Sequence, residues 1–102
     1  MGNSVKIDIP HGRIADFCRK YHVRKLSFFG SVLREDFGPE SDVDVLVEFI
    51  EGMGPGLFGL SHMELELSEM LGRKADLRTP SELSRYFRDE VISSARVEYA
   101  EG

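Results

Sequence analysis

Residues 27–49 read SFFGSVLREDFGPESDVDVLVEF, and this stretch decides the fold. Its apolar beginning, up to Phe29, predicts a buried strand that is halted at Gly30-Ser31. Turn-forming residues follow, and a second strand is predicted over 42–50, where the pattern is the clearest in the chain. Two strands joined by a glycine-led turn therefore form the centre of the predicted fold.

The second strand begins with two carboxylates, Asp42 and Asp44, separated by one valine. Alternate residues of a strand share a face, so the two aspartates lie on one side, about 6.5–7 Å apart at the backbone. The opposite face is apolar and is expected to enter the core through Val43, Val45, Val47 and Phe49. Like charges this close disfavour each other's ionisation unless a cation lies between them. Because all the donors are oxygens, the pair predicts half of a Mg²⁺ or Mn²⁺ site.

Gly30-Ser31 supplies features that suit a phosphate. A glycine at a strand end lets backbone approach a ligand closely, and a serine at the start of a helical turn offers N–H groups and a hydroxyl to an anion. The spacing and the lysine of a P-loop are absent from the sequence. Arg34 is a further candidate phosphate contact, with an ordinary solvated charge as the equal alternative. Phosphates at this turn and metals at the aspartates would position a nucleoside triphosphate.

Asp76 is the candidate third carboxylate. It lies between Ala75 and Leu77 in a short predicted strand over 74–78, where an unpaired carboxylate is costly. If this strand lies beside the second one, Asp76 reaches the same cluster and can accept the proton of an attacking hydroxyl. An exposed edge-strand carboxylate is the alternative.

Composition sets the class of protein. The chain has 102 residues, a net charge of −5 and a pI near 5.1, which fits one domain and argues against broad binding to nucleic acid. The single cysteine, Cys18, excludes an internal disulfide and favours a reducing compartment. With no apolar run of membrane-spanning length, we expect a cytoplasmic protein without a membrane partner.

The remaining elements complete one unit of the α/β (α+β) class, with a short mixed sheet flanked by helices. Apolar spacing predicts helices over 11–22 and 57–71, the latter stopped by Gly72, and another helix starting at the Thr79-Pro80 cap. The expected organisation is an N-terminal arm over 1–10, a domain over 11–97 and a C-terminal tail over 98–102.

These motifs resemble a known family. Gly30-Ser31, ten intervening residues and then Asp42-Val43-Asp44 resemble the signature of the DNA polymerase beta nucleotidyltransferase superfamily. The flanks FFGSVLRE, SDVDVLVEF, GPGLFGL and LGRKADLRTPSEL are similar to the minimal nucleotidyltransferase (MNT) proteins, over about residues 12–97. Arg78 departs from the apolar residue expected there, a difference that we expect to affect sheet packing more than chemistry.

The resemblance implies a function. MNT proteins are typically antitoxins paired with a HEPN ribonuclease toxin, and some inactivate it by transferring AMP from ATP to a toxin tyrosine. By resemblance, Gly30 and Ser31 would bind the triphosphate, Asp42 and Asp44 would bind the metals, and Asp76 would be the third metal ligand and the base. Two Mg²⁺ ions are implied, with Mn²⁺ as the alternative, and ATP is the implied substrate.

Two other functions stay open at this point. The first is a binding antitoxin that neutralises its toxin through a stable complex, with the catalytic site unused. The second is transfer to a small molecule or an RNA end, which the acidic balance and the lack of room for an acceptor-binding domain disfavour. The lack of room favours an acceptor supplied by a partner protein.

Overall fold

The computed structural model describes residues 7–34, 37–38 and 40–101. Parts of the predicted N-terminal arm and of the turn over 36–41 lie outside the described residues. In chain order the elements are α1 His11–Lys20, β1 Val23–Phe29, the short 3₁₀ helix η1 Gly30–Leu33, β2 Val43–Phe49, α2 Gly56–Leu71, β3 Ala75–Arg78, the 3₁₀ turn η2 Pro80–Glu82, α3 Arg88–Ser94 and β4 Arg96–Ala100.

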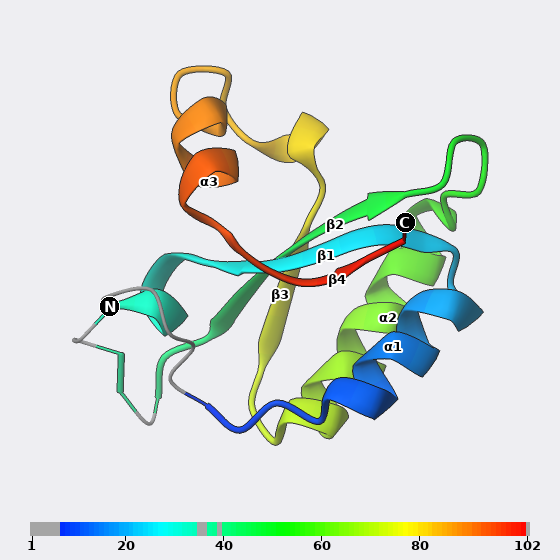
Figure 1. Cartoon of the computed structure of the whole chain (residues 1–102), viewed down its shortest axis with the longest axis horizontal. Helices are drawn as coiled ribbons and strands as arrows, with labels where there is room; N and C mark the ends of the chain where they lie inside the picture. The colour runs from blue at the N-terminus through cyan, green and yellow to red at the C-terminus, as the bar shows by residue number, and fades with distance from the viewer. Residues whose placement is uncertain (1–6, 35–36, 39, 102) are drawn as a thin grey trace.

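The strands form one mixed sheet in the order β3-β2-β1-β4, as Figure 1 shows. Strand β1 pairs antiparallel with both β2 and β4, whereas β3 runs parallel to β2. The parallel pair requires a crossover, and α2 provides it. Helices α1 and α2 lie side by side against the sheet, while α3 lies apart from them (Figure 1). The small mixed sheet flanked by helices confirms the predicted fold class.

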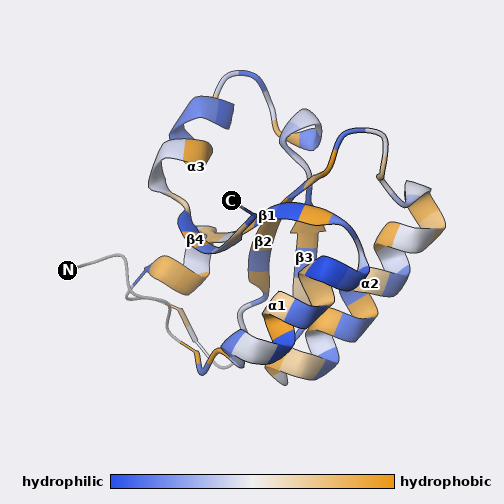
Figure 2. Ribbon diagram, turned by 45° about the vertical axis from the view of Figure 1, so that its right-hand side comes forward, coloured by the Kyte–Doolittle hydropathy of each residue, from blue (hydrophilic) through white to orange (hydrophobic). Residues whose placement is uncertain are grey.

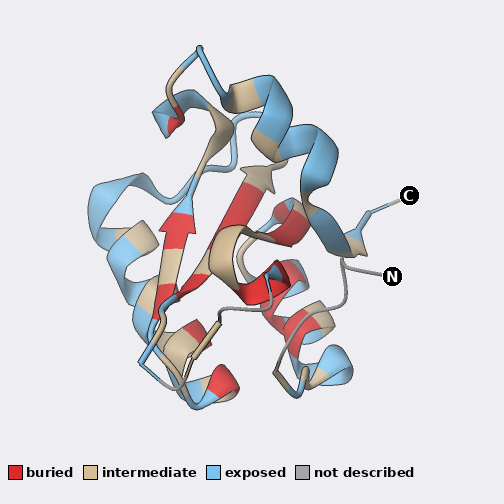
Figure 3. Cartoon of the chain, turned by 90° about the vertical axis from the view of Figure 1, so that its left-hand side faces the viewer, coloured by how far each residue is buried: buried red, intermediate tan, exposed pale blue. Residues whose placement is uncertain are grey.

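The core lies between the sheet and the helices α1 and α2. Val43, Val45 and Val47 of β2 are fully buried there and Phe49 is partly buried, and the apolar stripes of the two helices face them (Figures 2 and 3). The main contributors are Ile14, Phe17 and Cys18 of α1, Met63 and Leu67 of α2, and Val43, Val45 and Val47 of β2. Within the described ranges, every helix is too short or too polar to cross a membrane.

Two elements differ from the sequence prediction. The cap at Thr79 starts only the turn η2, and Glu82 accepts a hydrogen bond from the Thr79 N–H at 3.0 Å, but the next helix begins at Arg88. Residues expected to begin a C-terminal tail belong instead to the edge strand β4. This strand is mostly exposed, so its pattern is weak, and its pairing with β1 comes from tertiary contact.

The start of α1 contacts the edge strand β4. The His11 side chain, at the start of α1, lies 2.5 Å from a carboxylate oxygen of Glu98 in β4. Ile7 and Ile9, just before α1, are partly buried against the core. Part of the predicted N-terminal arm therefore packs on the domain.

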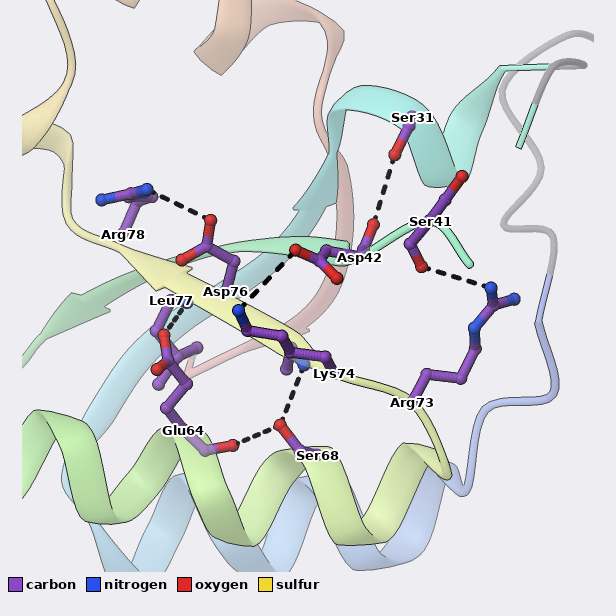
Figure 4. Close-up of polar contacts among 11 residues, drawn as sticks. Ser31, Ser41, Asp42, Glu64, Ser68, Arg73, Lys74, Asp76, Leu77 and Arg78 are labelled. Carbon is purple, nitrogen blue, oxygen red and sulfur yellow. Dashed lines mark hydrogen bonds and ion pairs between the residues drawn. The ribbon is translucent and has the colours of Figure 1, made fainter. Parts of the chain in front are cut away.

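Side chains of α2 cover the open edge of β3. The N–H of Leu77 donates to Glu64 at 2.9 Å, and the N–H of Ala75 donates to the Ser68 hydroxyl at 2.9 Å. Ser68 in turn donates to the Glu64 carbonyl at 2.7 Å (Figure 4). These contacts satisfy backbone groups that an edge strand would otherwise leave unpaired, and they fix the strand that bears Asp76.

Candidate active site

Strands β2 and β3 bring two of the predicted carboxylates into register. Asp44 and Asp76 are direct neighbours in the parallel pair, so both project from the face opposite the buried valines. Both are partly buried, whereas Asp42, which precedes β2, is exposed. The predicted adjacency of the strands bearing Asp44 and Asp76 is therefore confirmed.

Gly30 lies directly against Asp44. Its φ is +72°, and a Cβ built on it would lie 2.5 Å from Asp44 Oδ2. A side chain here would collide with the carboxylate and would also strain the backbone. Gly30 was expected to let the backbone approach a ligand closely. In the structure, the group that already requires a glycine here is the Asp44 side chain.

Ser31 joins the turn to both aspartates. Its hydroxyl donates to the Asp42 carbonyl at 3.2 Å (Figure 4). Its backbone N–H acts on the Asp44 carboxylate and lowers the pKa of that group. The groups that the sequence assigned to phosphate therefore hydrogen-bond within the site in this structure. A role toward phosphate stays a prediction, as does that of Arg34, which is exposed just after η1.

The environment of Asp44 opposes its negative charge. Burial raises the pKa of Asp44 above its ordinary value of 3.8, and the carboxylates of Asp76 and Asp42 raise it further. The Ser31 N–H and the more distant charge of Arg78 act in the opposite direction on this pKa. The site thus concentrates negative charge that a cation would relieve.

Two cations contact the outer carboxylates. Arg78 places a guanidinium nitrogen 3.1 Å from Asp76 Oδ2, and Lys74 places its Nζ 4.0 Å from Asp42 Oδ2 (Figure 4). The expectation that Arg78 affects sheet packing more than chemistry stays a prediction. Its side chain is exposed and pairs with the third carboxylate instead of filling space in the sheet.

The residues fit a divalent cation in their chemistry. They supply carboxylate oxygens, the ligands that Mg²⁺ prefers, and Gly30 leaves room beside Asp44. As the side chains stand, however, the described residues contain no group of three or more His, Cys, Asp or Glu arranged to hold a metal ion. Asp76 points toward Arg78 instead (Figure 4), so a three-carboxylate site would need Asp76 to turn.

Arg73 is a supporting residue that the sequence analysis missed. Its guanidinium donates to the carbonyls of Gly38 and Ser41, the latter at 3.2 Å, and lies 4.3 Å from the centre of the Phe37 ring. It thereby fixes the described part of the segment that leads into Asp42. In the sequence, Arg73 is only a basic residue just before the predicted strand that bears Asp76. That position does not indicate which groups its side chain contacts.

Comparison with known proteins agrees with this geometry. The family model for the nucleotidyltransferase domain matches residues 12–99. The protein adenylyltransferase homologue MJ0435 of Methanocaldococcus jannaschii is 34% identical over 83 residues, which cover 81% of this chain and 87% of that protein. Protein adenylyltransferase MntA of Thermococcus cleftensis is 38% identical over 73 residues, which cover 72% of each chain.

Solved structures share the fold. A minimal nucleotidyltransferase superposes with a TM-score of 0.70 and 28% identity, covering 83% of this chain and 85% of that one. A chain of a toxin–antitoxin crystal structure with AMP-PNP gives a TM-score of 0.73 at 16% identity, and the match covers 91% of this chain and 75% of that one. A chain of the complex of a tri-AMPylated HEPN toxin of Shewanella oneidensis with MNT antitoxin gives a TM-score of 0.64 at 16% identity. The match covers 89% of this chain and 70% of that one.

Proposed function

Because this chain belongs to the nucleotidyltransferase domain family, we propose that it transfers AMP from ATP to a hydroxyl group of a partner protein. One observation carries the proposal: Asp44 and Asp76 are in register on adjacent strands, with Gly30 lying against Asp44. Relatives that match most of the chain are named protein adenylyltransferases, which supports AMP as the transferred group.

Each site residue receives a role in this proposal. Asp42, Asp44 and Asp76 would hold two Mg²⁺ ions, which supply charge stabilisation of the triphosphate and of the leaving pyrophosphate. Asp76 would also accept the proton of the acceptor hydroxyl. The oxygen of that hydroxyl would bond to the α-phosphorus of ATP as pyrophosphate leaves. Gly30 and Ser31 would orient the phosphates, and Arg34 would contact them from the end of η1.

The proposed acceptor is a tyrosine of a HEPN ribonuclease toxin. Similar folds occur in toxin–antitoxin complexes, one with AMP-PNP and one with an AMPylated HEPN toxin. Those partners belong to the other proteins, and their shared fold supports the same pairing here. A compact domain of this size also has no separate acceptor-binding unit among its described residues.

The test is the intact mass of the partner after incubation with this chain, ATP and Mg²⁺. A gain of one or more AMP masses is expected, and Asp42→Ala with Asp44→Ala should abolish it. Tandem mass spectrometry of the modified partner would then identify the acceptor residue. An unmodified partner in the presence of the folded wild-type chain would contradict the proposed transfer.

A second candidate is neutralisation by binding alone, and exposed apolar residues favour it. Leu57 and Phe58, at the start of α2, are 85% and 95% exposed. Leu57 also lines an apolar groove together with Phe49, Pro55 and Leu60. If the variant lacking Asp42 and Asp44 carboxylates still neutralised the toxin in full, binding would be the function and transfer would be dispensable.

A further inference from the structure

The contacts of Arg78 place it in the candidate active site. It follows Asp76 by two residues in β3, so the two side chains share one face of the sheet. A guanidinium nitrogen lies 3.1 Å from Asp76 Oδ2, and the side chains are 47% and 31% exposed respectively. In Figure 4 the Asp76 carboxylate points toward Arg78.

The charge of Arg78 also reaches the neighbouring strand. Asp44 pairs in register with Asp76, and the pKa of Asp44 is lowered by Arg78 while burial raises it. Lys74 also contacts one of the carboxylates, Asp42, at the longer distance of 4.0 Å. Arg78 therefore makes a closer ion pair with these carboxylates than Lys74 does.

A guanidinium and a divalent cation compete for the same carboxylate. An oxygen engaged in a charge-assisted hydrogen bond must give it up to become a metal ligand, and the positive charge of the guanidinium repels the ion. Among the described residues no group of three carboxylates is arranged to hold a metal ion, and Asp76 is engaged by Arg78.

We infer that Arg78 is a positioning residue that holds Asp76 on itself and so weakens metal binding until a nucleotide is present. The inference rests on the proposed function, since it requires these carboxylates to be metal ligands. A triphosphate offers the guanidinium another anion that suits its forked geometry. Release of Asp76 would then coincide with arrival of the substrate, and metal binding would depend on nucleotide.

The test measures Mn²⁺ binding to the nucleotide-free protein by the electron paramagnetic resonance signal of unbound Mn²⁺. Arg78→Gln should bind Mn²⁺ about tenfold more tightly than wild type, an effect of the size seen for residues that orient metal ligands. Arg78→Lys keeps the charge and should stay within about threefold of wild type. Equal or weaker binding by Arg78→Gln would overturn the inference.

Arg19→Gln is the matched control. Arg19 forms an Arg–Asp pair of the same kind, 2.8 Å from Asp16, on helix α1, which covers the other face of the sheet. Its loss changes the net charge equally and should leave Mn²⁺ affinity unchanged. Tightening as large as that of Arg78→Gln would show a general charge effect and would refute a specific role for Arg78.

Asp44→Asn separates failure of the inference from failure of the metal site. If this variant abolishes Mn²⁺ binding but Arg78→Gln does not tighten it, the metal site stands and only the role of Arg78 falls. If Asp44→Asn binds Mn²⁺ like wild type, the proposed metal site is wrong and the inference falls with it.

A nonhydrolysable ATP analogue tests the dependence on nucleotide. With saturating analogue, the Mn²⁺ affinities of wild type and Arg78→Gln should converge to within about twofold, because the wild-type guanidinium no longer holds Asp76. An undiminished difference would show that Arg78 opposes the metal at all times and would reject the proposed release.

Discussion

Gly30 shows how much of the site depends on one missing side chain. Its φ of +72° and the 2.5 Å distance from a built Cβ to Asp44 Oδ2 impose two separate requirements. The first concerns backbone conformation and the second concerns the position of the carboxylate. From the sequence, this glycine was expected to let the backbone approach a ligand closely. The group that lies against it, the Asp44 carboxylate, could be seen only in three dimensions.

Gly30→Ala should lower the free energy of unfolding by about 1–2 kcal/mol or more and should reduce AMP transfer by more than about tenfold. The strain arises at positive φ, and the collision displaces Asp44. Gly52→Ala is the control, because Gly52 has a φ of +80° with no atom within 4 Å of a built Cβ. Urea unfolding and transfer assays should show strain in both variants but loss of transfer only at Gly30. Equal activity in the two would contradict the assigned contact.

Asp44→Asn should stabilise the metal-free protein at neutral pH by up to about 1 kcal/mol, a small value because solvent screens a half-buried group. In the wild-type chain, the raised pKa of Asp44 means that its carboxylate binds a proton more readily in the native state than in the unfolded chain. The associated stability is present at low pH and is lost as the pH rises through the raised pKa of Asp44. The gain from Asn should therefore shrink as the pH falls toward the ordinary value of 3.8.

Urea unfolding with a chelator, repeated from about pH 7 to about pH 4, measures this dependence. Asp16→Asn, at an exposed position on α1, is the comparison and should not show the same gain. A lower stability of Asp44→Asn at neutral pH would mean that the hydrogen bond from the Ser31 N–H outweighs the cost of the charge.

At the scale of elements, the position of Asp76 depends on how α2 holds β3. Apolar periodicity predicted both elements closely, because their buried residues recur at the spacings of a helix and a strand. The hydrogen bonds from β3 to Glu64 and Ser68 could not be predicted. They join side chains to backbone groups across a crossover, and many acidic and hydroxyl residues in the helix offered equivalent chemistry.

Glu64→Ala should lower the free energy of unfolding by about 1–3 kcal/mol, since the partly buried Leu77 N–H loses its acceptor at 2.9 Å. Glu64→Gln keeps a carbonyl oxygen and should retain most of the stability. Glu69→Ala, at an exposed position on the same helix, should change it by less than about 0.5 kcal/mol. Chemical unfolding of the three variants tests this, and similar losses in all of them would assign the effect to the helix alone.

At the scale of the whole molecule, the candidate active site and the exposed apolar residues of α2 belong to the same described domain. The resemblance of the Gly-Ser and Asp-x-Asp motifs to those of a known family predicted the nucleotidyltransferase family, which the family match confirms. Strand β4 was missed because only a partner strand, about seventy residues away in the chain, gives its mostly exposed residues an ordered place.

Leu57→Ser combined with Phe58→Ser should weaken the proposed complex with a HEPN toxin by at least about tenfold and leave the folded domain intact. Both side chains are at least 85% exposed, so their loss costs little in the chain itself. Leu65→Ser, 69% exposed farther along α2, is the comparison. Calorimetric titration of toxin against each variant measures the difference, and unchanged affinity in the double variant would exclude this surface from the complex.

The contact between His11 and Glu98 has a consequence for folding. It joins residues that lie 87 positions apart in the chain, so it can form only after β4 has reached its place beside β1. Contacts between distant residues form slowly, because a long loop must close first. Pairing of β4 with β1 therefore also holds the start of α1 in place.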